Sequence, residues 1–178
     1  MYSIAFIDTE VDPESKKILD IGGLRSDNGM QYHGASGGEF IEFLKGVRFV
    51  CGHNMLHHDA KYIGNALSKA GIAAWNYIDT LYMSPLLFPM KLYHALLKDD
   101  KLQSNEMNNP LNDSIKARDL FYDEVRAFQE LDKDMKDIFC TLLSGRDEFQ
   151  AFFRFIDYTL EQEVDKEALI RSRFEGGI

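Results

Sequence analysis

The sequence predicts an α/β domain in which strands come first and helices fill the last third. Short aromatic and β-branched runs, bounded by turn residues, recur over the first half of the chain and are typical of buried strands. Segments with helical apolar spacing are interleaved among them. From residue 114 onward, apolar residues recur every three or four positions, which indicates consecutive helices. This order of elements predicts one α/β domain.

The first half of the chain alternates predicted strands and helices. DPESKK supplies turn residues after the first strand, and DNGM forms a hairpin turn between the second and third. Each helix ends at a glycine, Gly46 or Gly71. The predicted strands are 2–8, 18–26, 31–36, 47–54 and the first part of 73–89, whose second part is a turn or short helix. The predicted helices are 39–46 and 56–71.

The second half begins with a polar, irregular stretch over 92–113 and is helical beyond it. The predicted helices are 114–131, 133–145 and 147–157. Neither repeats nor a low-complexity linker divide the chain, so we expect a single domain over residues 1–178. Its final residues, FEGGI, do not form a capped helix end. We therefore expect this domain to be the N-terminal part of a longer protein.

Composition places the protein among globular cytoplasmic domains. The chain has 178 residues, of which 45% are hydrophobic, enough for a sizeable core. It has no apolar run long enough to span a membrane and no secretory signal, so we expect no membrane partner. Cys51 and Cys140 are far apart and form no CxxC pair. They are predicted to be buried free thiols in a reducing compartment, which indicates the cytoplasm.

The formal net charge of −9 at first argues against a nucleic-acid partner, but the charge is unevenly distributed. From Asp119 onward the sequence has 15 acidic and 8 basic residues, a net charge of −7. The first 118 residues have 14 acidic and 12 basic residues, a net charge of −2. If several of those 14 acids bind metal, the remaining surface is close to neutral. A polyanionic ligand is therefore compatible with the sequence.

Two carboxylates interrupt the apolar first strand. Asp8 and Glu10 are two residues apart in IAFIDTEVD, so a strand presents both on one face. Burying two adjacent carboxylates costs several kcal/mol each unless a cation lies between them. Their oxygen ligands suit magnesium or manganese. The alternative is a strand end at which Asp8 caps a turn and Glu10 is solvated.

Two further acids follow later in the chain. Asp59 is predicted in the first turn of a helix that follows a buried strand, where it would project back toward the strand ends. Asp113 opens the next helical stretch. Each acid also has a structural alternative. The negative charge of Asp59 would interact favourably with the helix dipole at an N-terminus, and Asp113 would serve as an N-cap.

Together, FIDTE, GHNMLHHDAKYI and NNPLNDSIKARDLF resemble the three acidic motifs of the DEDD, or DnaQ-like, superfamily of 3′–5′ exonucleases. The resemblance covers roughly residues 4 to 125. It implies a ribonuclease-H-like fold with a mixed five-stranded sheet flanked by helices. It also implies two bound Mg²⁺ or Mn²⁺ ions held by the carboxylates of Asp8, Glu10, Asp59 and Asp113.

The chain departs from the family pattern at the general base. The family places a His five residues, or a Tyr four residues, before the last Asp, where this chain has Asn108 and Asn109. Neither amide can accept a catalytic proton. His94, 19 residues before Asp113, is the candidate base, with a surface or capping role as the alternative. The arrangement YHALLKDDKL…NNPLNDS is similar to exonuclease-like domains fused to RecQ-type helicases in some bacteria.

These features predict a metal-dependent 3′–5′ exonuclease that releases nucleoside monophosphates from single-stranded or frayed DNA ends. RNA is an alternative substrate, and a fused or associated helicase is the expected partner. The alternative from another class is a catalytically silent nucleic-acid-binding or docking domain. The residues predicted to contact substrate are Thr9, Asn54, Met55 and Lys98.

Overall fold

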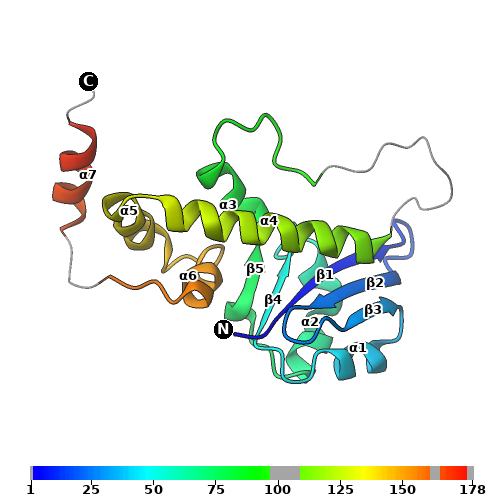
Figure 1. Cartoon of the computed structure of the whole chain (residues 1–178). Coiled ribbons are helices and arrows are strands. Elements are labelled where there is room, and N and C mark those ends of the chain that lie inside the picture. Colours follow the sequence, from blue (N-terminus) through cyan, green and yellow to red (C-terminus); the bar gives the residue numbers. More distant parts are fainter. Residues whose placement is uncertain (1, 97–108, 161–164, 176–178) are drawn as a thin grey trace.

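A mixed five-stranded sheet forms the centre of the first half of the chain (Figure 1). The computed structural model describes residues 2–96, 109–160 and 165–175. The strands are β1 (Ile4–Val11), β2 (Ile18–Arg25), β3 (Gln31–Gly34), β4 (Phe49–Gly52) and β5 (Tyr77–Asp79). Their order in the sheet is β3-β2-β1-β4-β5. β2 is antiparallel to both β1 and β3, whereas β1, β4 and β5 are parallel.

Helices lie on both faces of this sheet. α1 (Gly37–Phe43) and α2 (Asp59–Lys69) pack on one face and α4 (Pro110–Glu130) on the other. The other helices are α3 (Thr80–Leu87), α5 (Lys133–Leu143), α6 (Gln150–Ile156) and α7 (Lys166–Phe174), with a 3-10 turn over Ala74–Asn76. The predicted α/β class and the mixed five-stranded sheet with a helical last third are confirmed. This architecture is ribonuclease-H-like, as the motif resemblance implied.

Two helices begin earlier than their sequence patterns predict. α4 starts at Pro110, because the side chain of Asn109 accepts hydrogen bonds from the Leu111 and Asn112 amides. α1 includes the two glycines after Ser36, whose hydroxyl caps its first turn. The charged helix α7 was not predicted, since it has no buried residue and so no apolar periodicity. Of the irregular stretch 92–113, residues 97–108 lie outside the described residues.

Alternation along β1 divides the core into two layers. Ala5 and Ile7 pack in the cluster that contains α1 and α2, whereas Ile4 and Phe6 pack in the cluster that contains α4 and α6. The ring of Phe6 contacts that of Phe121 from α4, with centroids 5.7 Å apart. Fully burying such a side chain stabilises a fold by about 1.5–3 kcal/mol. Continuing the alternation puts the Asp8 and Glu10 side chains on the α4 face and Thr9 on the α2 face.

The remaining predicted features of the core agree with the structure. Cys51 and Cys140 are buried and free, as expected. α2 is followed by Gly71, whose φ of +83° is the left-handed conformation typical of a helix stop. Within the described residues, no helix combines the length and apolarity that a membrane crossing requires.

Candidate metal centre

Three of the predicted carboxylates meet beside the carboxyl-terminal part of β1. Asp8, Glu10 and Asp113 each offer an oxygen, and these oxygens all lie within 4.8 Å of one another. All three residues are partly buried. Asp8 and Glu10 come from one face of β1, and Asp113 comes from the first turn of α4. Residues more than 100 positions apart in sequence therefore form one acidic group.

A glycine on the neighbouring strand allows this approach. Gly22 pairs with Asp8 across β1 and β2. A Cβ atom at position 22 would lie 2.1 Å from both the Pro110 carbonyl carbon and the Leu111 nitrogen. The backbone that starts α4 therefore lies directly on the sheet, which no larger residue at position 22 permits. This contact holds Asp113 next to the β1 carboxylates.

The geometry fits a small divalent cation. Magnesium binds oxygen at about 2.1 Å, so two ligands of one ion are at most about 4.2 Å apart. The three oxygens all lie within 4.8 Å of one another, a separation close to that span. Three partly buried carboxylates are also the donor set that hard cations prefer.

A lysine also contacts the acidic group. The Lys116 ammonium lies 3.3 Å from Asp113 Oδ1 and donates a hydrogen bond to it, one turn further along α4. The N-cap of α4 is Asn109, so the alternative role of Asp113 as the N-cap is wrong. Asp113 lies within the first helical turn instead, where the helix dipole favours its negative charge.

Asp59 is positioned differently from the other three acids. It begins α2, is fully buried, and accepts a hydrogen bond of 2.6 Å from the Thr9 hydroxyl. Thr9 faces α2, so Asp59 does not join the group of three carboxylates. Its second oxygen, Oδ2, is buried and has no hydrogen-bond partner within the described part of the chain. Burial raises the pKa of Asp59 to about 6, although the hydrogen bond from Thr9 opposes this shift.

Two histidines form hydrogen bonds with hydroxyls of α3. His94 is partly buried, and its Nδ1 shares a hydrogen bond of 2.9 Å with the Ser84 hydroxyl on α3. His53 follows β4, and its Nδ1 lies 2.9 Å from the Thr80 hydroxyl. Burial lowers the pKa of His53, and the charge of His94 lowers it further. The charges of Asp79 and Asp113 raise this pKa.

Asp79, which the sequence reasoning missed, fixes the loop that carries His53. Its buried carboxylate accepts hydrogen bonds from the backbone amides of Asn54, Leu56 and Leu81, at 2.8, 3.0 and 3.0 Å. Asn54 has a φ of +67°, a conformation that Asn tolerates better than most residues. The available signal was positional: β4 and β5 are parallel to β1, so their carboxyl ends reach the same edge of the sheet.

The predicted substrate-contacting residues are not all at the surface. Met55 is fully buried in the α2-side core, and the Thr9 hydroxyl is bonded to Asp59. Asn54 is partly exposed at the loop before α2. Lys98 and Asn108 lie outside the described residues. The substrate-binding roles of these residues stay predictions.

Comparison with known proteins gives little beyond this geometry. A scan against protein-family models and a search of curated proteins found no match. Among solved structures, the chain is similar to the family B DNA polymerase from the hyperthermophilic archaeon Pyrobaculum calidifontis, with 15% sequence identity and a TM-score of 0.42. The match covers 93% of this chain and 31% of the polymerase chain. The conclusions on function therefore depend on the carboxylates and their surroundings.

Proposed function

We propose that this domain is a metal-dependent 3′–5′ exonuclease of the DEDD type, which releases nucleoside monophosphates from single-stranded or frayed DNA ends. The observation that carries the proposal is the convergence of Asp8, Glu10 and Asp113 within 4.8 Å on a ribonuclease-H-like sheet. The sequence order of these acids resembles that of the DEDD motifs. Three partly buried carboxylates this close together repel one another unless a cation lies between them.

The ligand residues would hold two Mg²⁺ or Mn²⁺ ions, and such ions would supply an activated water and charge stabilisation for the leaving 3′ oxygen. Asp8, Glu10 and Asp113 form the main group of carboxylates. Asp59 is the proposed fourth ligand from the motif resemblance, although it lies outside this group of three; its buried Oδ2, which has no hydrogen-bond partner within the described residues, is the atom that would bind an ion. An unsatisfied carboxylate oxygen in the interior is costly, and a cation at the site relieves that cost.

His94 is the proposed general base. Its Nδ1 is engaged with Ser84, so Nε2 is the atom that accepts a proton from the attacking water. The charges of Asp113 and His94 both act on the pKa of His53, and this supports a position of the proposed base on the same side of the sheet as Asp113. Ser84 is buried in α3 and orients the imidazole. In this proposal His94 replaces the base that the family has four or five residues before its last Asp.

The substrate is proposed to be a DNA 3′ end, with RNA as the alternative. A helicase, fused or associated, is the proposed partner that exposes single strands. The weakly charged first part of the chain, with a net charge of −2 over 118 residues, repels a polyanion less than the last third does. We expect affinity for nucleic acid to depend on the metal and to fall steeply as salt rises.

The proposal is tested by degradation of 5′-labelled single-stranded DNA and RNA with magnesium or manganese. We expect a ladder that shortens from the 3′ end and is absent in chelator, in Asp8→Ala and in Asp113→Ala. Asp119→Ala, an exposed acid further along α4, is the matched control and should retain activity. His94→Ala should slow the reaction by about 10²–10⁴-fold. No ladder on either substrate with either metal would favour the silent binding domain instead.

A further inference from the structure

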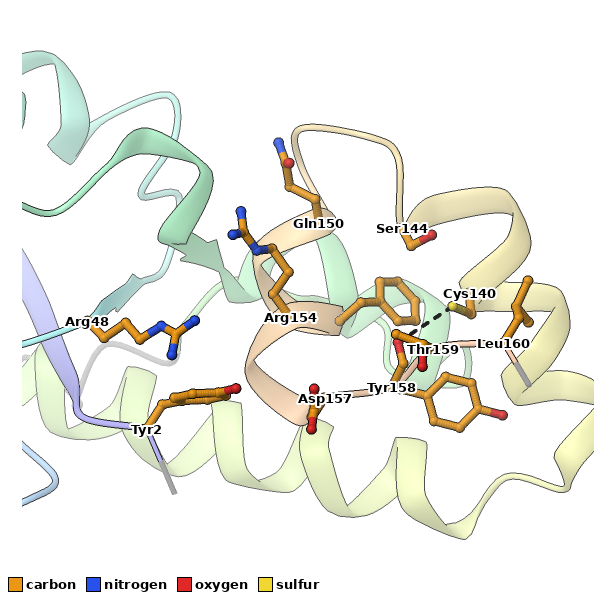
Figure 2. Close-up of a pocket in the computed structure, with 11 residues that line it drawn as sticks. Tyr2, Arg48, Cys140, Ser144, Gln150, Arg154, Asp157, Tyr158, Thr159 and Leu160 are labelled. Atoms are coloured by element: carbon orange, nitrogen blue, oxygen red, sulfur yellow. Dashed lines mark hydrogen bonds between the residues drawn. The ribbon is translucent and has the colours of Figure 1, made fainter. Parts of the chain in front are cut away.

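A second site with binding chemistry lies at the other end of the sheet. A cavity of about 370 Å³ opens between the start of β1, the entry to β4, and α6 with the segment that follows it (Figure 2). Its lining includes Tyr2, Arg48, Gln150, Arg154 and Asp157. Tyr2 and Asp8 are six residues apart along an extended chain, about 20 Å at 3.3 Å per residue. The cavity is therefore separate from the candidate metal centre.

Two arginines at this cavity have no carboxylate partner among the described residues. The chain has eight arginines. Among the described residues Arg25, Arg118, Arg126, Arg171 and Arg173 form ion pairs, whereas Arg146, which does not line the cavity, forms none. Arg48 and Arg154 form no ion pair with any residue of the described chain, although the net charge is −9. Asp157 also lines the cavity and is not within ion-pair distance of either one.

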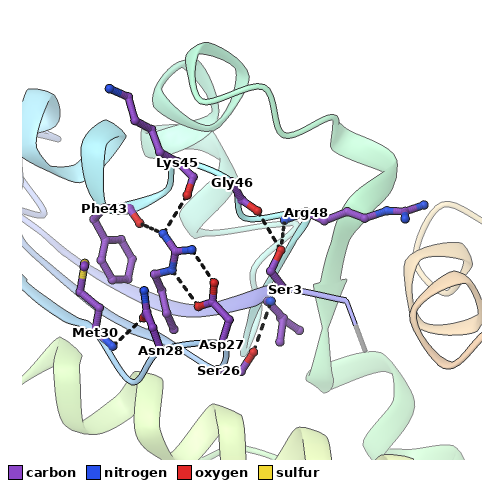
Figure 3. Close-up of polar contacts among 11 residues, drawn as sticks. Ser3, Ser26, Asp27, Asn28, Met30, Phe43, Lys45, Gly46 and Arg48 are labelled. Carbon is purple, nitrogen blue, oxygen red and sulfur yellow. Dashed lines mark hydrogen bonds and ion pairs between the residues drawn. The ribbon is translucent and has the colours of Figure 1, made fainter.

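Arg48 is held in place by its backbone and by an aromatic ring. Its backbone amide donates to both the hydroxyl and the carbonyl oxygen of Ser3, and the Ser3 hydroxyl donates to the Gly46 carbonyl (Figure 3). The guanidinium carbon lies 4.1 Å from the ring centroid of Tyr2. Figure 2 shows the side chain pointing from the sheet toward α6. Stacking on Tyr2 orients the guanidinium before any ligand arrives.

Arg25, at the end of β2, differs from Arg48 and Arg154 in that its guanidinium has hydrogen-bond partners within the described part of the protein. Its guanidinium donates to the Asp27 carboxylate and to the carbonyl oxygens of Phe43 and Lys45, so its donors are largely used within the protein (Figure 3). The side chains of Arg48 and Arg154 are exposed and retain their planar sets of N–H donors. Such donor sets match the oxygens of phosphate or carboxylate in a bidentate geometry.

We infer that this cavity binds a phosphate-bearing nucleotide, with the phosphate held between Arg48 and Arg154. The cavity volume is within the range of small-molecule sites, about 300–1,000 Å³, and accommodates a single nucleotide rather than a protein segment. The cavity also offers both kinds of hydrogen-bonding group beside the two arginines: the Asp157 carboxylate is an acceptor, and the Gln150 amide supplies a donor. A base, which offers both donors and acceptors, complements these groups better than a polycarboxylate does. This inference does not depend on the exonuclease proposal.

The test is calorimetric titration of the whole chain with dAMP in the presence of EDTA, so that no metal site contributes. We expect one molecule of dAMP to bind, competed by inorganic phosphate. Arg48→Gln and Arg154→Gln should each weaken binding by at least tenfold, whereas Arg126→Gln, which removes an arginine on α4 away from the cavity, should not. Because both cavity arginines are exposed, thermal unfolding should be unchanged in these variants.

Three results would overturn the inference: no binding of dAMP, equal binding by the Arg48 and Arg154 variants, or competition by citrate but not by phosphate. Asp8→Ala should bind dAMP in EDTA like the unmodified chain. Loss of binding in Asp8→Ala would instead place the nucleotide at the metal centre and contradict a second site. Failure of this test leaves metal-dependent DNA degradation unaffected, so the two proposals are separable.

Discussion

Gly22 on β2 faces the backbone of Pro110 at the start of α4 so closely that a methyl group would lie 2.1 Å from its carbonyl carbon. That contact sets how near α4 comes to the sheet. Asp113, three residues further along, is thereby placed within 4.8 Å of Asp8 and Glu10. The cluster of three carboxylates therefore depends on the absence of a side chain at position 22 as much as on the acids themselves.

Gly22→Ala should push the first turn of α4 away from β2. Overpacking of a closed contact typically costs about 1–3 kcal/mol. We expect the variant to lose that much stability in urea unfolding and to bind Mn²⁺ at least tenfold more weakly. Gly64→Ala is the matched control, because Gly64 is inside α2 and no atom lies within 4 Å of its Cβ position. It should stabilise the protein by up to about 1 kcal/mol. Equal effects of the two variants would contradict the close-approach explanation.

Asp79→Ala should loosen the loop that carries His53 and Asn54. Removing its carboxylate leaves three backbone amides without acceptors, two of them in that loop and one at the start of α3. Hydrogen bonds to a charged group contribute about 1.5–3 kcal/mol each, so we expect a loss of at least about 2 kcal/mol. Asp119→Asn, at an exposed ion pair, should cost less than about 0.5 kcal/mol. The measurement is the free energy of unfolding of both variants in urea. A loss of stability in Asp79→Ala as small as that in Asp119→Asn would contradict the prediction and show that water replaces these hydrogen bonds.

Glu124 should make the fold less stable as pH rises. It is fully buried, neither carboxylate oxygen has a partner within the described chain, and burial raises its pKa well above 4.5. The charges of Asp79 and Asp123 raise this pKa further, while that of Lys91 lowers it. The folded state thus retains a proton that the unfolded state releases. Stability should fall by up to about 1.4 kcal/mol per pH unit from pH 4.5 up to the folded pKa.

Glu124→Gln removes this titration while keeping the shape of the side chain. Unfolding by urea at pH 5, 6, 7 and 8 should show a shallower loss of stability in the variant, because every other acid titrates alike in both proteins. The quantity to compare is the slope of the unfolding free energy against pH. The absolute stability of the variant is less informative, because the buried Gln amide also has polar atoms without partners. Parallel pH profiles would mean that Glu124 is solvated in the native protein.

Thr9→Val should destabilise the protein more at pH 7.5 than at pH 4. The Thr9 hydroxyl donates to Asp59, whose pKa is about 6 in the folded state, so the bond is made to a charged carboxylate only at the higher pH. A hydrogen bond to a charged group is worth about 1.5–3 kcal/mol, against about 0.5–1.5 for a neutral pair. Thr9→Ser retains the hydroxyl and should behave like the unmodified chain. Urea midpoints at the two pH values give the comparison.

The sequence predicted the parts of the site that follow from local geometry. Strand alternation placed Asp8 and Glu10 on one face, and the helical pattern after NNP placed Asp113 near a helix start. The position of Asp59 depends on how α2 packs beneath Thr9, which is a tertiary relationship without a local signal. The contact of Gly22 with Pro110 likewise joins residues far apart in the chain.

Asp79 was missed for a related reason. It occupies an ordinary strand-to-helix junction in the sequence, and it also caps α3. Its importance comes from the bonds that it accepts from the loop after β4, which only the assembled parallel strands bring within reach. The sequence YIDT indicates that Asp79 can cap a helix, but it gives no sign that the amides of Asn54 and Leu56 also donate to Asp79.

The central claim, that the β1 and α4 carboxylates bind a catalytic divalent ion, is tested most directly by titrating the chain with Mn²⁺ and following free Mn²⁺ by electron paramagnetic resonance. We expect saturable binding by the unmodified chain and by Asp119→Asn. Binding should be at least tenfold weaker in Asp8→Asn and in Asp113→Asn. Equal Mn²⁺ binding by all four proteins, or none by any of them, would contradict the claim.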